Sequence, residues 1–208
     1  MNRGKGGPTP LGIVVFVVLI IILVIGAFFV VTGGGDRSPS VLDEPEVSVI
    51  DTSSERSVRL TVYGNIVANE ERNSYQVTIS PDTRLAEARK GYAGRAIETR
   101  QFNNSAGAYE EFVYALEKLD YQERRELPDE QIDPRGTCAT GNRYVFEILE
   151  FGEVIDSAWT TTCGGSKGNF AGEYERAEDL FRAQIPDDDM DDVIDALDER
   201  RSSGLPKL

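Results

Sequence analysis

Carboxylates are the most abundant acid–base side chains of this chain. Its 208 residues include 36 aspartates and glutamates and no histidine. The lack of histidine excludes Ser-His-Asp and Cys-His catalysis and every histidine-ligated metal site. Two carboxylates at a set separation still suffice for glycoside hydrolysis, so a carboxylate-dependent hydrolase acting on envelope polysaccharide is the alternative function. Because no Asp or Glu stands in a distinguishing context, we predict no catalytic residue.

A glycine-rich segment in the second half of the chain could hold a small ligand. Residues 164–169 read Gly-Gly-Ser-Lys-Gly-Asn, which lacks the residue order of a phosphate-binding P-loop. A flexible turn explains this composition better. If the protein binds a small molecule, we expect the site in this loop, next to the single tryptophan. The candidate ligand residues are Trp159, Lys167, Asn169 and Phe170.

The aspartate-rich segment after Pro186 has the spacing of a calcium loop. Aspartates from Asp187 to Asp198 fall on loop positions 1, 3, 5, 9 and 12. However, Asp192 replaces the glycine that such a loop requires, and position 12 is not glutamate. The same residues could open a helix, where aspartates complement the helix dipole. We therefore predict no metal site and no cofactor, and we interpret residues 187–208 as an acidic C-terminal helix or tail.

The two cysteines, Cys138 and Cys163, are expected to form a disulfide. They flank the clearest hairpin pattern in the chain, whose turn is centred on residues 151–152, so they lie nearly opposite each other. A disulfide requires an oxidising compartment. The alternative is a redox-active pair, but such pairs usually have the C-x-x-C spacing that this sequence lacks.

Residues 11–31 are a continuous apolar run of 21 residues without a charge, an amide or a proline. As one helix with a rise of about 1.5 Å per residue, the run spans the roughly 30 Å hydrocarbon core of a bilayer. A cleaved signal peptide is the alternative, but its apolar region would have about 7–15 residues and a small-x-small cleavage site. We therefore predict an uncleaved, single-pass transmembrane helix in contact with the lipid bilayer.

Charge on the two sides of this run predicts its orientation. Arg3 and Lys5 precede the run, whereas Asp36 and Arg37 after it cancel each other. The tail of residues 1–10 should therefore be cytoplasmic, and the chain after Gly35 should be extracytoplasmic. From residue 38 onward there are 35 acidic and 19 basic residues. This charge repels nucleic acid, which we exclude as a partner, and would attract another envelope protein with a basic surface.

Composition separates a linker from a folded domain. Residues 32–56 are rich in proline, serine and acids, and we predict a flexible linker. The extracytoplasmic domain is expected to span residues 57–186, which is long enough for one hydrophobic core.

Periodicity within the domain predicts an α+β fold. Period-two alternation indicates two adjacent strands, and a third segment could be a helix or, as we favour, half of a hairpin turning at residues 91–94. A helix begins near the cap candidates Asn104 and Ser105, and a second helix ends at Pro186. We expect an antiparallel sheet with two or three helices packed on one face. The segments with strand patterns are 58–63, 75–79, 84–90, 143–148 and 154–162.

Several short motifs resemble those of uncharacterised single-pass cell-envelope proteins of small-genome, Saccharibacteria-type bacteria. The motifs are YEEFVYAL at 109–116, GTC at 136–138, WTTTC at 159–163, GNF at 168–170 and LFRAQIPD at 180–187. The resemblance covers the second half of the chain. It implies a bacterial cell surface and supports a structural disulfide, but it carries no catalytic residue. The sequence as a whole predicts a membrane-anchored, extracytoplasmic binding or interaction module without catalytic activity.

Overall fold

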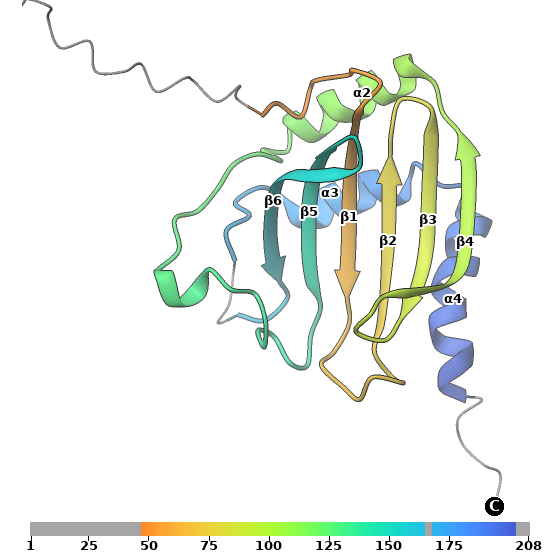
Figure 1. Cartoon of the computed structure of the whole chain (residues 1–208), viewed down its shortest axis with the longest axis vertical. Coiled ribbons are helices and arrows are strands. Elements are labelled where there is room, and N and C mark those ends of the chain that lie inside the picture. Colours follow the sequence, from red (N-terminus) through yellow and green to blue (C-terminus); the bar gives the residue numbers. More distant parts are fainter. Residues whose placement is uncertain (1–46, 165–167, 203–208) are drawn as a thin grey trace, which may run out of the picture. The chain divides into compact units, whose positions relative to one another are not determined.

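Six antiparallel strands form a single sheet in the order β4-β3-β2-β1-β5-β6 (Figure 1). The structure is a computed structural model that describes residues 47–164 and 168–202. The elements are β1 (Arg56–Tyr63), β2 (Asn73–Ile79), β3 (Thr83–Lys90), β4 (Arg95–Asn103), α2 (Ala106–Glu117), the short 3-10 helix η1 (Asp129–Gln131), β5 (Arg143–Glu150), β6 (Glu153–Thr161), α3 (Tyr174–Arg182) and α4 (Asp187–Ser202).

Helices α2, α3 and α4 lie on one face of the sheet (Figure 1), and the hydrophobic core lies between them and the strands. Val58, Leu60 and Val62 alternate along β1 toward this face, and none is more than 4% exposed. Phe112 of α2 meets Phe181 of α3 over the same face, with ring centroids 5.2 Å apart. Helix α4 contacts β2, β3 and β4. The predicted α+β architecture, an antiparallel sheet with helices on one face, is confirmed for the described residues.

The local turn and cap signals lie where the sequence places them. β3 and β4 pair across a turn in which Gly91 and Gly94 both have positive φ, so the hairpin interpretation of this region is confirmed over the helical one. In the β5–β6 turn, Phe151 has φ 51° and Gly152 has φ 82°, the left-handed pair of a tight hairpin. Ser105 caps α2, because its side chain accepts a hydrogen bond from the Ala108 N–H.

The folded unit begins earlier than the predicted domain boundary near residue 57. Val49 is only 2% exposed. The side chain of Gln122 accepts a hydrogen bond from the Val49 N–H and donates one to the carbonyl of Val47, each at 2.6 Å. The compact unit therefore starts at Val47, and residues 47–56 belong to the domain and not to the linker. The proline- and serine-rich composition of this segment favours a linker, and it gives no sign that Val49 is buried in the core.

The acidic segment after Pro186 is a helix docked on the sheet over Asp187–Ser202, the part of the predicted segment 187–208 that the structure describes. Val193 of α4 is fully buried in the core. On the flank of the helix, Arg100 of β4 lies 3.2 Å from Asp189 and 2.8 Å from Asp192. These aspartates thus pair with a strand arginine, and no group of three or more potential ligand side chains among the described residues is placed to hold a metal ion.

The predicted transmembrane helix (11–31), the cytoplasmic tail (1–10) and the linker up to residue 46 lie outside the described residues. Within residues 47–164 and 168–202, no helix is both long enough and apolar enough to cross a bilayer.

Candidate functional site

Four side chains form a row across the sheet face that is opposite the core. Arg143 of β5, Tyr63 of β1, Ser74 of β2 and Arg89 of β3 are consecutive cross-strand partners. Directly paired residues share one face of a sheet, and Tyr63 follows the core residue Val62. All four side chains therefore point away from the core, onto the face that none of the described helices covers.

Three loops turn this row into a pocket of about 520 Å³. Arg72 comes from the β1–β2 loop, Tyr92 from the β3–β4 turn and Arg135 from the loop that precedes β5. The other lining residues are Thr61, Ile66, Gly91, Ala93, Gly94 and Gly136. We call this site the arginine pocket, because it is lined by four arginines and by no Asp or Glu. This is unusual in a chain with a net charge of −14.

Two arginines and two tyrosines alternate within the pocket. The guanidinium of Arg72 lies 5.4 Å from the ring centroid of Tyr63 and 5.4 Å from that of Tyr92. The guanidinium of Arg143 lies 4.7 Å from the Tyr63 ring. Two cations therefore lie next to the Tyr63 ring, which can attract them but cannot neutralise them. Burial lowers the pKa of Arg72, which is only 5% exposed, and the positive charge of Arg143 acts in the same direction.

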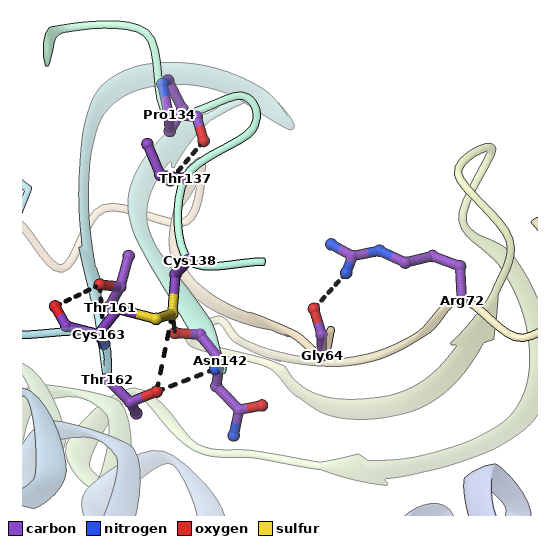
Figure 2. Close-up of a disulfide and its surroundings, with 9 residues drawn as sticks. All are labelled: Gly64, Arg72, Pro134, Thr137, Cys138, Asn142, Thr161, Thr162 and Cys163. Atoms are coloured by element: carbon purple, nitrogen blue, oxygen red, sulfur yellow. Dashed lines mark hydrogen bonds between the residues drawn. A yellow bond between two sulfur atoms is a disulfide. The ribbon is translucent and has the colours of Figure 1, made fainter. Parts of the chain in front are cut away.

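Hydrogen bonds hold these two guanidinium groups in place. Arg72 donates to carbonyl oxygens of the β1–β2 loop, including that of Gly64 (Figure 2), and Arg143 donates to the carbonyl of Pro134 at 2.8 Å. Within the described residues, neither guanidinium has a carboxylate at ion-pair distance. The buried Nε–H groups of Arg143 and Arg89 also have no hydrogen-bond acceptor among the described residues. The pocket thus has more cationic donors than acceptors, and its chemical complement is an oxyanion.

The two remaining arginines of the pocket are paired. Arg89 lies 3.3 Å from the carboxylate of Glu87. Arg135, at the exposed rim, donates to both carboxylate oxygens of Asp133 and lowers the pKa of that group to about 2. Arg72 and Arg143 are therefore the pocket arginines without a carboxylate at ion-pair distance among the described residues, and the charge of Arg143 also helps to lower the pKa of Asp133.

A disulfide restrains the loop that carries Arg135 of the pocket. The sulfur atoms of Cys138 and Cys163 are 2.07 Å apart, which confirms the predicted disulfide (Figure 2). Cys138 belongs to the loop that carries Arg135, and the same loop accepts a hydrogen bond at Ala139 from the N–H of Ile66. The disulfide therefore ties the loop that provides the rim to the end of β6, beside the β1–β2 loop.

The ligand residues predicted from the sequence lie elsewhere, at the edge strand β6. Asn169 accepts a hydrogen bond from the Trp159 N–H at 2.8 Å, and Trp159 is 7% exposed. Phe170 is 1% exposed and stacks on Phe146 with ring centroids 4.2 Å apart. The structure brings these three candidates together as packing and edge-pairing residues, and Phe170 also borders a smaller hollow of about 290 Å³. Lys167 is outside the described residues.

Glycine at position 168 explains why this segment lies so close to β6. It has φ 64°, and a Cβ atom there would lie 2.0 Å from the carbonyl oxygen of Trp159. Only glycine permits this approach, so the glycine-rich composition that suggested a ligand loop has a packing reason.

The residues of the arginine pocket are not among the sequence candidates. Their shared signal is position: Tyr63 ends β1 and Arg89 nearly ends β3, whereas Arg72 precedes β2 and Arg143 begins β5. Because neighbouring strands of an antiparallel sheet run in opposite directions, the ends of β1 and β3 lie beside the beginnings of β2 and β5, at the same end of the sheet. Finding the pocket from the sequence requires the pairing of β1 with β5, two strands that are far apart in the chain.

No protein-family model and no curated protein matches this chain. The functional interpretation is therefore based on the chemistry of the arginine pocket.

Proposed function

We propose that this chain is a membrane-anchored, extracytoplasmic binding module of the cell envelope that holds an anionic ligand in the arginine pocket and does not catalyse a reaction. The apolar run of residues 11–31 supports the anchor, and the disulfide is consistent with an oxidising compartment. The binding role rests on the pocket itself.

The observation that carries this proposal is that Arg72 and Arg143 lie side by side in the pocket with no carboxylate at ion-pair distance among the described residues. The chain has 36 acidic residues, yet none lines the pocket. The guanidinium groups of Arg72 and Arg143 both lie beside the Tyr63 ring and repel each other, and partial burial strengthens this repulsion. A bound anion would relieve it and would accept hydrogen bonds from both groups.

Binding fits the pocket better than catalysis does. Its lining contains no carboxylate, thiol or amine that could act as a general base or nucleophile. The hydroxyl groups of Thr61 and Ser74 are therefore not activated there. A carboxylate-dependent hydrolase would instead need two carboxylates facing one cleft.

Thermal unfolding of the full-length chain in neutral detergent tests the binding role. At roughly five times its dissociation constant, inorganic phosphate should raise the unfolding midpoint by about 2–4 °C over chloride at the same ionic strength. The Arg143→Gln variant should lose this increase. Arg176→Gln, which removes an exposed arginine of α3 that pairs with Glu173, should keep it. Equal increases of the unfolding midpoint in both variants would argue against the site. Turnover of an envelope polysaccharide by the purified chain would argue against a non-catalytic role.

Protease accessibility tests the proposed topology. Protease added to intact cells should remove the chain after residue 35 and leave the anchor behind, because the positive flank of the apolar run stays in the cytoplasm. Immunoblotting with antibodies against the domain reads out the result. Full protection of the domain in intact cells, with cleavage after lysis, would reverse the proposed orientation.

A further inference from the structure

We propose that the arginine pocket selects a small organic anion in which an oxyanion group is attached to a single apolar ring, such as an aryl carboxylate or aryl phosphate, and that it excludes polyanions. This inference deepens the anion-binding role proposed above and rests on it. It follows from the donors at the base of the pocket, the apolar groups at its mouth, its size and the charge around it.

The oxyanion would be held by the guanidinium groups of Arg72 and Arg143, which both lie beside the Tyr63 ring. Arg72 and Arg143 lie 5.4 and 4.7 Å from this ring, and their hydrogen bonds to loop carbonyl oxygens fix their positions. Planar guanidinium groups present paired N–H donors that match the oxygens of a carboxylate or a phosphate. Since the groups are already positioned, little side-chain entropy is lost on binding.

The ring would lie against the apolar mouth of the pocket. Tyr92 and Ile66 line the pocket and are 59% and 41% exposed, which is high for large hydrophobic side chains. Tyr92 is nevertheless held in place: its hydroxyl donates to the carbonyl of Val67 at 2.9 Å, and its N–H donates to the side chain of Asn69 at 3.0 Å. A fixed, exposed aromatic ring beside two cations provides a stacking surface for a ring that carries the anion.

The volume of the pocket sets the size of the ligand. About 520 Å³ lies within the range of roughly 300–1,000 Å³ that is typical of small-molecule sites. Such a pocket accommodates one ring and its acidic group, and a lone inorganic ion would leave its apolar mouth uncovered.

The carboxylates around the pocket disfavour the binding of anionic polymers. The β1–β2 loop that carries Arg72 also carries the exposed residues Glu70 and Glu71. Asp133 lies at the rim through its pair with Arg135, and the chain as a whole has a net charge of −14. Charges interact over about 8 Å at physiological salt, so a small anion inside the pocket meets mainly guanidinium groups. A polyanion extending from it would meet carboxylates.

Isothermal titration calorimetry of the full-length chain in neutral detergent tests this inference with four probes: benzoate, phenyl phosphate, acetate and inorganic phosphate. Benzoate should bind about fivefold more tightly than acetate, and phenyl phosphate about fivefold more tightly than inorganic phosphate, because of the stacked ring. Tyr92→Ala should abolish this preference, so that benzoate binds no more tightly than acetate and phenyl phosphate no more tightly than inorganic phosphate. Tyr114→Ala, which removes a 41% exposed tyrosine of α2, is the matched control and should change nothing.

Arg143→Gln should weaken binding of all four probes by about tenfold or more, the effect of losing a charge-assisted hydrogen bond. Circular dichroism checks that each variant folds, and the exposed position of Tyr92 keeps the test valid even if Arg143→Gln does not fold. If ring-bearing and ring-free anions bind equally and Arg143→Gln weakens both, ring selection is wrong and the anion-binding role stands. If no probe binds, or if a folded Arg143→Gln variant binds normally, the proposed function itself is wrong. Tighter binding of long-chain polyphosphate, or of vesicles of anionic lipid, than of phenyl phosphate would overturn the exclusion of polyanions.

Discussion

Replacing both Cys138 and Cys163 with serine is expected to lower the free energy of unfolding by about 3–4 kcal/mol, the chain-entropy value for a loop of this length. The bond closes a loop with a sequence separation of 25 residues, and this loop includes the whole β5–β6 hairpin. Without it, the unfolded chain gains conformational freedom and the folded chain keeps its sheet. Urea unfolding followed through the fluorescence of Trp159, which lies near the end of β6 and is 7% exposed, measures the difference.

The same double variant separates the role of the disulfide from that of the arginines. Arg143 belongs to β5, whereas Arg135 belongs to the loop that the disulfide restrains. The folded double variant should therefore keep most of its affinity for phenyl phosphate, and Arg143→Gln should lose it. Reduction of the unmutated chain should reproduce the result of the double variant. An unchanged unfolding midpoint after either treatment would show that the bond does not stabilise the domain.

The sequence predicts those parts of this fold that depend on neighbouring residues. The hairpin around Gly91 and Gly94 follows from glycines that supply positive φ between alternating strands, and α2 begins at a serine cap in front of an apolar stripe. Both signals lie within a few residues of the structure that they produce. Val49 and helix α4 show the opposite case, because each is fixed by contacts with residues that are distant in the sequence.

The arginine pocket depends on such distant contacts throughout. Each of its arginines resembles an ordinary surface charge in the sequence. The predicted strands 58–63 and 84–90 and the predicted turn at 91–94 contain Tyr63, Arg89 and Tyr92, but their local patterns do not show that these residues meet. The pairing of Tyr63 with both Arg143 and Ser74 brings the site together. Strand order is a global property that a single sequence specifies through the whole core, so local periodicity does not reveal it.

Replacing Phe170 with alanine is expected to lower the free energy of unfolding by about 3–5 kcal/mol, as for other buried aromatic side chains. Phe170 is 1% exposed, stacks on Phe146 at 4.2 Å and meets Tyr121 edge-to-face at 6.1 Å. Removing the ring leaves a cavity between the sheet and the segment that follows the disulfide. Urea unfolding measures this loss. The matched control is Phe151→Ala, since the Phe151 side chain is 78% exposed at a hairpin tip and its removal should change stability by only about 0.5 kcal/mol or less.

The Phe170→Ala variant also decides between the two candidate sites. If its role is packing, the folded fraction of the variant should bind phenyl phosphate with unchanged affinity, because Phe170 does not line the arginine pocket. If the variant is as stable as the unmutated chain but no longer binds the probe, the ligand site lies in the loop with Trp159 and Asn169, as the sequence suggested. Stability and affinity measured on the same sample therefore distinguish a core residue from a ligand residue.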